Sequence, residues 1–541
     1  MSMNNQSLIL LGAKCALLPL LLLLAISQAA PALTIEGSLA YAIDIPRIYG
    51  ALRLPGETAP MTGSVEDIYG NPVETFTIEA YFDTGSSGVL ISDSTANMLE
   101  VPRLADVTFE DVGVAGTDEF AVSAELFVHL ATFGGDTTGI DDPASFATTY
   151  NQQFGPVRTQ LSQPSTVPGL EGTDIFGMPL FIDKTVVMDM RAVNQILGTI
   201  VTSVHNSGEV IAGLPAATRT VATSYGDFSR FTQTVQTSTG NPLDPAVFGP
   251  TMVHNPFIGP DPDPTGPPDP DAPPGITVVS NGVTTTSSWL LDTGAGLSML
   301  SQQQANIHGI RYRVGHEAGS EDPLLEFISD GSLVPNQYQS QIGGIGGVIN
   351  VAGFMLDKLS LPTVEGESID YLSAPVSVLD ITLLDPLTME TLTLDGVFGM
   401  NNLLASATIE GGFPTDIRSG AYDFVSFDEP SGVLSLVLQY PPGDFNFDGA
   451  VDIYDLGILA TNYDTTSGMT WETGDADGDS AVDIIDLGIL ATNYGTSTEA
   501  AASATPEPGT MTLIGVGALA LLFRRRKLSR RPPQGKFSDN A

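Results

Sequence analysis

The 541-residue chain is longer than a single hydrophobic core usually supports, so two or three folded units are expected. Apolar residues make up 42% of the chain and charged residues 15%, a balance that excludes a largely disordered protein. With 63 acidic against 20 basic residues the formal net charge is −43, which argues against nucleic acid or an anionic membrane surface as a partner.

Residues 1–32 are predicted to be a secretory signal peptide. Lys14 precedes an apolar stretch that runs from Cys15 to Ile26, and a region suited to cleavage follows at residues 29–32. An uncleaved anchor is the alternative. Because Cys15 is the only cysteine, removal of the leader leaves no thiol, which excludes a disulfide, a thiolate metal site or a cysteine nucleophile.

Residues 33–258 are predicted to form the first of two related β-rich halves. The abundance of Gly (57) and Pro (38) favours strands and turns over long helices. An apolar strand enters an abrupt Asp83-Thr84-Gly85-Ser86 turn, and a second apolar strand follows. A glycine-marked turn at 113–116, an alternating strand at 126–133 and the segment 174–178 come next.

The second half, residues 276–440, repeats these four elements in the same order after a Pro-rich linker at 259–275. Asp292-Thr293-Gly294 lies between two apolar strands, and the later elements recur at 343–347, 355–361 and 395–400. One Asp-Thr-Gly would be an ordinary turn, since Asp and Gly favour turns. Two copies in matching context indicate a duplication.

These paired motifs resemble those of pepsin-like aspartic peptidases. The resemblance implies a mainly β, bilobal acid-protease fold over roughly residues 35–440, with Asp83 and Asp292 as the catalytic pair. Two carboxyls about 3 Å apart share one proton, so one can take a proton from water while the other donates to the substrate carbonyl. The resemblance also implies that catalysis needs no cofactor. The residues implied to support the two catalytic loops are Thr84, Gly85, Ser86, Thr293 and Gly294.

Two features depart from this family. Ser86 matches a hydroxyl that supports the first aspartate, whereas Ala295 lacks the hydroxyl on the other side. The turn at 112–116 stands where a flap tip is expected but has no tyrosine, and Phe120 is an apolar candidate for that role.

Residues 443–496 contain two near-identical repeats with oxygen-bearing side chains at positions 1, 3, 5, 9 and 12 of a loop, as Ca²⁺ prefers. The repeats resemble a dockerin, a small α-helical module of EF-hand type, which implies a cohesin-like partner; a calcium-stiffened spacer is the alternative. Folding is expected to depend on the metal. The predicted ligands, with position 7 acting through its backbone carbonyl, are Asp444, Asn446, Asp448, Ala450, Asp452 and Asp455, then Asp475, Asp477, Asp479, Ala481, Asp483 and Asp486.

Residues 497–541 are predicted to be a sorting tail. The segment Pro506-Glu507-Pro508 precedes an apolar helix at 511–523, short for a membrane span, and a basic cluster at 524–527. This order resembles the Pro-Glu-Pro (PEP-CTERM) C-terminal sorting signal, which implies export, processing, and a cell-surface or extracellular location. Only this segment is expected to contact a membrane. A plain tail anchor is the alternative.

The sequence therefore predicts a secreted or cell-surface aspartic endopeptidase that acts on protein or peptide substrates. The alternative is a non-catalytic protein of the same fold that binds a surface or matrix through its calcium module.

Overall fold

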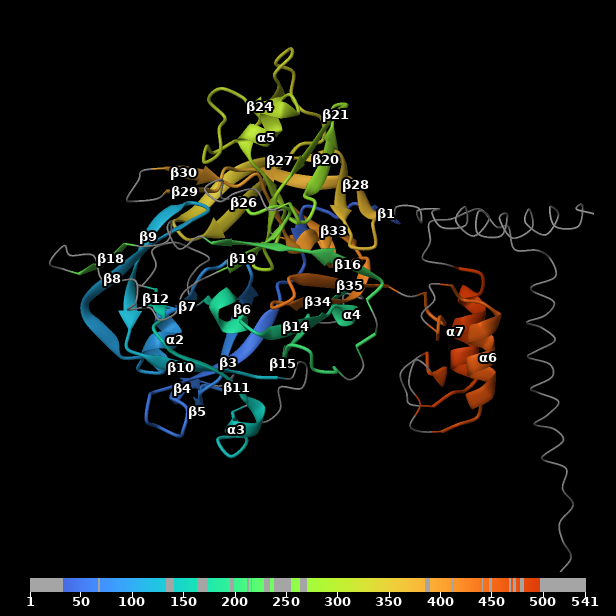
Figure 1. Ribbon diagram of the computed structural model, residues 1–541, viewed down its shortest axis with the longest axis horizontal. Coiled ribbons are helices and arrows are strands. Elements are labelled where there is room, and N and C mark those ends of the chain that lie inside the picture. Colours follow the sequence, from blue (N-terminus) through green and yellow to red (C-terminus); the bar gives the residue numbers. More distant parts are fainter. Residues whose placement is uncertain are drawn as a thin grey trace, which may run out of the picture. The chain divides into compact units, whose positions relative to one another are not determined.

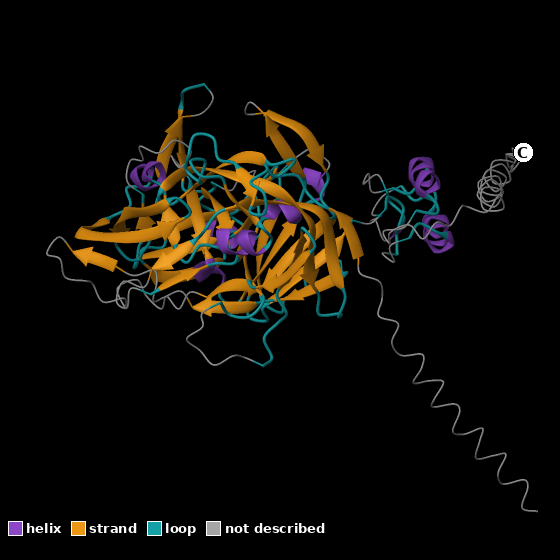
Figure 2. Cartoon of the chain, turned by 90° about the horizontal axis from the view of Figure 1, so that it is seen from above, coloured by secondary structure: helices purple, strands orange, loops and turns teal. Residues whose placement is uncertain are grey.

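The computed structural model describes residues 33–496, apart from 67–68, 133–140, 163–172, 195–198, 212–213, 216, 228–233, 238–253, 263–269, 385–389, 411–412, 440, 447–449, 467–468, 470–472 and 477–480. The predicted leader, the sorting tail with its apolar helix, and part of the predicted linker lie outside these residues. The chain divides into two compact units, Met1–Leu438 and Gln439–Ala541. Strands dominate the first unit, which confirms the prediction of a mainly β protein (Figures 1 and 2).

A ten-stranded sheet holds the first Asp-Thr-Gly motif. Its central strands are β6, β13 and β7, in that order, so that the strand from the 174–178 segment lies between the two strands that flank the motif. The order across the sheet is β11 (Gln152–Val157), β10 (Leu126–Leu130), β3 (Arg47–Arg53), β6 (Ile78–Asp83), β13 (Asp174–Gly177), β7 (Val89–Ile91), β12 (Gln160–Leu161), β9 (Gly116–Ser123), β8 (Arg103–Gly113) and β18 (Thr234–Thr237).

An eleven-stranded sheet holds the second motif in the same arrangement, with β31 between β22 and β23. Two strands lie off the main path, because β1 (Leu33–Glu36) pairs with β28 and β26 (Tyr338–Gly344) pairs with β27. The path itself is β17 (Ser224–Asp227), β19 (His254–Ile258), β22 (Trp289–Leu291), β31 (Gly396–Phe398), β23 (Met299–Leu300), β28 (Ser368–Val378), β27 (Gly347–Pro362), β20 (Ile276–Ser280) and β21 (Val283–Ser287).

A five-stranded sheet combines strands from the middle of the first unit's sequence with its last two strands. Strand β14 pairs antiparallel with β34, and Val186 lies opposite Phe427 (Figure 1). A segment from the middle of the unit's sequence is therefore hydrogen-bonded through the backbone to the strands at its C-terminal end. The order is β15 (Val201–Asn206), β14 (Lys184–Asp189), β34 (Tyr422–Asp428), β35 (Val433–Leu438) and β16 (Arg219–Ala222).

The remaining elements of this unit are short. The small sheets are β2 (Tyr41–Ala42) with β32 (Ser406–Glu410) and β33 (Phe413–Arg418), β4 (Gly63–Glu66) with β5 (Pro72–Thr75), β24 (Ile310–Tyr312) with β25 (Leu325–Phe327), and β29 (Thr382–Leu384) with β30 (Thr391–Thr393). The helices are α2 (Asp93–Met98), α3 (Phe146–Thr149), α4 (Arg191–Asn194) and α5 (Gln302–Ile307), with single turns η1 (Met178–Phe181) and η3 (Met400–Asn402).

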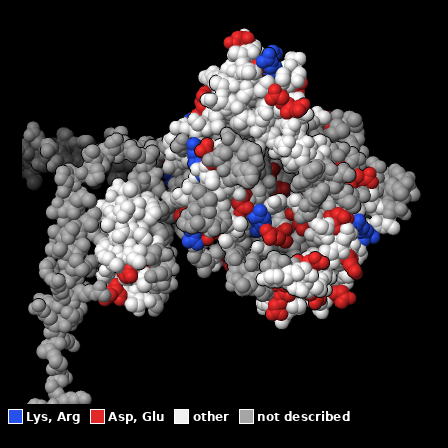
Figure 3. Space-filling model, turned by 180° about the vertical axis from the view of Figure 1, so that it is seen from behind, with Lys and Arg blue, Asp and Glu red and all other residues white. Residues whose placement is uncertain are grey.

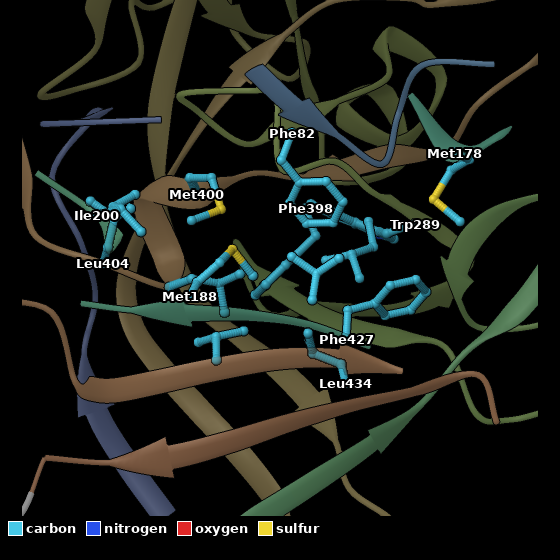
Figure 4. Packing of buried hydrophobic residues seen from close by; sticks show 14 of the residues in the cluster. Phe82, Met178, Met188, Ile200, Trp289, Phe398, Met400, Leu404, Phe427 and Leu434 are labelled. Atoms are coloured by element: carbon cyan, nitrogen blue, oxygen red, sulfur yellow. The ribbon is translucent and has the colours of Figure 1, made fainter. Parts of the chain in front are cut away.

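The main hydrophobic core runs beneath both motifs. Phe82 ends the apolar side of β6, and its ring lies 4.6 Å from that of Phe181. Figure 4 shows Phe82 and Phe398 packed close together above Phe427 of the five-stranded sheet. Burial of each such ring stabilises the fold by roughly 1.5–3 kcal/mol. Because the core contains side chains from all three sheets, it holds the two motifs at a fixed separation.

In the second unit the described residues form two helices, α6 (Ile453–Asn462) and α7 (Ile484–Asn493). Each helix begins with a reciprocal capping box, formed by Asp452 with Asp455 and by Asp483 with Asp486. The core is small and consists of the buried residues Phe445, Val451, Leu459, Val482, Leu487 and Leu490. Among the described residues of the whole chain, no helix is both long and apolar enough to cross a membrane.

Candidate active site

Two equivalent strand ends place the predicted catalytic carboxyls. Strand β6 pairs in parallel with β13, so that Asp83 lies opposite Gly177. In the second sheet β22 pairs in parallel with β31, and the amide of Asp292 donates to the carbonyl of Phe398 at 3.1 Å. Asp83 is thus the last residue of β6 and Asp292 is the first residue after β22, and the carboxyl ends of parallel strands are a common place for functional groups.

The two loops approach one another so closely that each glycine touches the aspartate of the other loop. A Cβ atom added to Gly85 would lie 2.5 Å from the carboxyl carbon of Asp292. A Cβ atom added to Gly294 would lie 2.5 Å from the carboxyl carbon of Asp83. The equal distances indicate twofold-like symmetry, and they show why both positions require glycine.

Reciprocal hydrogen bonds between Thr84 and Thr293 join the loops. The amide of Thr84 donates to Oγ1 of Thr293 at 3.1 Å, and the amide of Thr293 donates to Oγ1 of Thr84 at 3.0 Å. The two hydroxyls donate in turn to the carbonyls of Leu291 and Phe82, at 2.6 and 2.7 Å. Both threonines are buried, so the loss of either hydroxyl would leave a buried amide unsatisfied at a cost of about 1–3 kcal/mol.

Backbone amides support both carboxylates. Oδ1 of Asp83 accepts a hydrogen bond from the Ser86 amide at 2.9 Å. Oδ1 of Asp292 accepts from the amides of Gly294 and Ala295, at 2.9 and 3.0 Å. The Ser86 hydroxyl donates to the Gly88 carbonyl at 3.3 Å, and the residue contacts Asp83 through its backbone amide. Since amides provide the support, Ala295 serves Asp292 without a hydroxyl.

The pKa values of both aspartates are raised. Burial raises the pKa of Asp83 well above its usual value, and the neighbouring Asp292 raises it further. Burial also raises the pKa of Asp292, against the opposing effect of its hydrogen bond with Asp83. Two carboxyl groups this close together disfavour double ionisation, so the raised pKa values favour a state in which the pair shares one proton. Both residues are half-buried and retain some exposure to solvent.

A second pair of glycines lets the central strands pass directly behind the loops. A Cβ atom on Gly177 would lie 2.2 Å from the Gly88 carbonyl oxygen, and one on Gly399 would lie 2.6 Å from that of Leu297. Both glycines belong to the near-identical segments that the sequence shows at 174–178 and 395–400. Their backbone approach buttresses each carboxyl loop from below.

Substitution of Gly294 by Ala is expected to abolish any activity of this site and to lower the free energy of unfolding by about 1–3 kcal/mol. The added methyl would overlap the Asp83 carboxyl and push the two loops apart. Activity assays and thermal unfolding would measure the two effects.

The matched control is Gly296→Ala in the same loop, where the nearest atom to an added Cβ is Cδ1 of Ile45 at 3.6 Å. That contact is an ordinary one, so activity and stability should stay close to those of the parent. Equal losses in the two variants would contradict the proposed overlap.

The flap candidate Phe120 does not lie at a hairpin tip. Strands β8 and β9 form a long hairpin whose end pair is Gly113 opposite Gly116, with Val114 and Ala115 in the turn. Phe120 pairs with Phe109 lower in the hairpin, and both side chains are buried. The side chain at the tip is Val114, because the position of a residue in a hairpin depends on the strand register, which the sequence does not specify.

Asn255 is a site residue that the sequence did not indicate. Its side-chain amide donates to the carbonyl of Thr84 at 2.8 Å, and its Oδ1 accepts from the Ser87 hydroxyl at 2.9 Å. The residue is fully buried on β19, next to β22 in the second sheet. It is separated from Ser87 by 168 positions, so no local pattern could have revealed the contact.

The calcium-type loops of the second unit are only partly described. Asp448, Asp477 and Asp479 lie outside the described residues, and no cluster of three His, Cys, Asp or Glu side chains that could hold a metal occurs within them. The two final aspartates act alike: Asp455 accepts hydrogen bonds from the amides of Phe445 and Asp452, at 2.7 and 2.8 Å. Asp486 accepts from those of Ala476 and Asp483, at 2.7 and 2.6 Å.

The donor chemistry of these loops fits a calcium ion. Asp444 and Asp455 are fully buried, and Asp475 and Asp486 are 4% and 1% exposed. Residues 439–496 contain eleven acidic residues and no Lys, Arg or His, so no cation of this segment can neutralise the buried carboxylates. Buried charges require a partner or a metal. A carboxylate oxygen that accepts one amide still has a lone pair for a metal ion.

Comparison with known proteins identifies the C-terminal tail. The family of PEP-CTERM protein-sorting motifs matches residues 504–527, which confirms the sorting signal predicted there. No curated protein matches the chain. The motif shows that the protein is exported and sorted through a C-terminal signal.

Proposed function

We propose that the chain is an aspartic endopeptidase with a bilobal, pepsin-like fold. The observation that carries the proposal is the symmetric carboxyl pair: a Cβ atom added to Gly85 would lie 2.5 Å from the carboxyl carbon of Asp292, and one added to Gly294 would lie 2.5 Å from that of Asp83. The parallel arrangements β6-β13-β7 and β22-β31-β23, and the hydrogen bonds between Thr84 and Thr293, support the same assignment.

The two neighbouring carboxyl groups can act together as a general acid and a general base. With one shared proton, the ionised carboxyl can take a proton from water while the protonated carboxyl donates to the oxygen of the scissile carbonyl. Amides fixed by the loop backbone hold Oδ1 of each aspartate, so the carboxyls do not need to reorient as the proton moves. Because burial raises both pKa values, the singly protonated pair should persist into mildly acidic solution.

The proposed substrate is an unstructured protein or peptide, and the test is its cleavage in acid. A peptide library offered between about pH 3 and 7 should be cut, and a statine-type inhibitor should block cutting by occupying the space between the carboxyls. A well-folded protein that cuts nothing would instead favour the non-catalytic alternative, a surface or matrix-binding protein of the same fold.

We propose further that the second unit is a dockerin-like module that binds two calcium ions. Each ion would be held by one of the two repeats, and the metal would neutralise buried carboxylates in a segment whose sequence has no Lys, Arg or His. The first turn of each helix exposes two large apolar side chains. They are Ile453 (49%), Tyr454 (70%), Ile484 (61%) and Ile485 (54%), and they form the face proposed for a cohesin-like partner.

We propose that the tail is removed after export, so that the protein is released or attached at the cell surface. Acidic side chains are spread over the face shown in Figure 3, which suits a soluble exterior protein and gives little attraction to anionic lipid.

The mass of the exported protein tests this processing. It should lack the basic cluster at 524–527, because a sorting signal is cut near Pro506-Glu507-Pro508. Intact-mass spectrometry of protein recovered from outside the cell measures this directly. A mass that still includes residues 509–541 would indicate a plain tail anchor.

A further inference from the structure

Two hairpins of the first unit end in the same way. In β8–β9 the end pair is Gly113 opposite Gly116, and in β26–β27 it is Gly344 opposite Gly347. Each pair encloses a two-residue turn with one branched apolar side chain, Val114 in the first and Ile345 in the second. One hairpin belongs to the sheet of Asp83 and the other to the sheet of Asp292.

The two tips touch one another. The amide of Ala115 donates to the carbonyl of Ile345 at 3.2 Å. A Cβ atom on Gly346 would lie 2.4 Å from the Gly116 nitrogen, and one on Gly344 would lie 2.5 Å from Cγ2 of Val114. A real Cβ atom could not occupy either position, so the tips can approach this closely only because residues 344 and 346 are glycine. The glycines therefore allow backbone-to-backbone contact between the tips.

The apolar side chain of each tip packs against the sheet of the other hairpin. Val114 packs against a cluster of the second sheet that includes Leu297 and also contacts Ala295, the residue that follows Gly294. Ile345 packs against a cluster of the first sheet formed by Phe109, Phe120 and Val122, which also contacts Leu90 of β7. Each tip thus reaches the sheet, and the neighbourhood of the loop, that carries the other aspartate.

We propose that β26–β27 is a second flap, and that the two flaps together control access to the Asp83–Asp292 pair. This inference rests on the proposed peptidase function and extends it. Val114 and Ile345 contact the substrate side chains on either side of the scissile bond, so extended peptides with apolar side chains there are the preferred substrates. Together, the two tips in contact cover the substrate, which is the role expected of a single flap tyrosine. Entry of a peptide requires the Ala115–Ile345 hydrogen bond to break and both apolar side chains to leave their clusters.

A disulfide between the tips tests the gate. Cys15 in the leader is the only cysteine of the chain, so the exported double variant Ala115→Cys, Ile345→Cys would contain two thiols and no others. The backbone contact between these residues places them within reach of a disulfide. Mild oxidation is expected to cross-link the tips and to lower the rate of peptide cleavage at least about 100-fold, and dithiothreitol should restore it.

The matched control is Thr277→Cys, Thr286→Cys. These residues lie opposite one another in the β20–β21 hairpin, and their hydroxyls are 2.8 Å apart. Oxidation should cross-link them without changing the rate of cleavage. Full activity of the cross-linked Ala115–Ile345 variant would overturn the proposal. So would failure of that variant to cross-link under conditions in which the control pair does.

A second measurement does not depend on peptidase activity. Coupling of a bulky amine to Asp83 and Asp292 by a carbodiimide, located by mass spectrometry, reports access to the carboxyl pair. Oxidation of the tip variant should slow this labelling, and equal rates in the oxidised and reduced forms would contradict the gate. A parent protein that is labelled in this gated way but cleaves no peptide would refute the peptidase function while supporting the two flaps.

Substrate preference tests the role of the tip side chains. Ile345→Ala should lower kcat/KM for peptides with a large apolar side chain beside the scissile bond by about 10-fold relative to peptides with Ala there, as expected for lost apolar contact. An unchanged preference in a variant with parental thermal stability would remove Ile345 from the substrate contact.

Discussion

Replacement of Asp83 or of Asp292 by Asn is expected to lower the rate of peptide cleavage by at least about 10²–10⁴-fold, the usual contribution of a positioned acid or base. Asn cannot take up or release the proton that the carboxyl pair shares, so either variant removes both the acid and the base. The double variant should therefore lose little more than each single variant, because the pair acts as one unit. Cleavage of an unstructured protein in acid measures all three.

The fold of these variants should remain intact, since Asn occupies nearly the same volume and keeps an oxygen to accept the loop amides. Asp330→Asn is a charge-matched control, because Asp330 is exposed and serves only the turn that contains Ser332. It should leave the rate unchanged. Cleavage that persists in the double Asn variant would contradict the mechanism.

The same variants predict an effect on stability that does not depend on catalysis. Burial and Asp292 raise the pKa of Asp83 in the folded state, so the folded protein binds this proton more tightly than the unfolded chain does. Its contribution to stability is complete below the pKa of the unfolded chain, near 3.8, and is lost as the pH rises through the folded value. Asn does not ionise, so the Asp83→Asn variant does not lose stability at this position as the pH rises. Its melting temperature should exceed that of the parent at pH 7, and the difference should disappear near pH 3.

Removal of calcium is expected to unfold the second unit. Its core, within the described residues, has only six buried apolar side chains, and Asp444, Asp455, Asp475 and Asp486 are buried in a segment that has no basic residue. Without a metal these carboxylates repel one another. Calcium at about 1,000 times its dissociation constant would stabilise the folded unit by about 4 kcal/mol. Circular dichroism of residues 439–496 should therefore show α6 and α7 form when calcium is added and melt when a chelator is added.

Variants of the loops make this test specific. Asp455→Asn and Asp486→Asn each remove one charge from the last position of a loop and should weaken binding at one site each. Asp464→Asn is the matched control, since Asp464 lies between the two loops at a positive φ of 72° that Asn also tolerates. It should leave the calcium titration unchanged. A dichroism spectrum that responds to neither calcium nor chelator would contradict the calcium-dependent fold.

Much of the site could be predicted from the sequence, because it depends on local patterns that occur twice. The apolar strand before each Asp-Thr-Gly turn is visible in the amino-acid sequence, and so is the recurrence of the Phe-Gly segments. These patterns indicate Asp83 and Asp292, and the structure brings each carboxyl against the glycine of the opposite loop. The C-terminal sorting signal was recognisable for the same reason, since its three parts are contiguous.

Other features were decided only by the packing of the sheets. The Ser86 hydroxyl turns to the Gly88 carbonyl rather than to Asp83, and Phe120 lies within its hairpin rather than at the tip. Both outcomes depend on backbone geometry and strand register, and a slip of one residue would move every side chain to the opposite face.

The sequence by itself thus determined which residues carry the proposed chemistry: the two aspartates, the glycines and threonines beside them, and the acidic repeats. The tertiary structure decided what those residues meet. The contact of Asn255 with Ser87, 168 positions away, and the contact of Ala115 with Ile345 depend on how two separate sheets face one another across a shared core. Local propensity does not contain that information, because the energy that orients the sheets comes from the burial of side chains contributed by the whole unit.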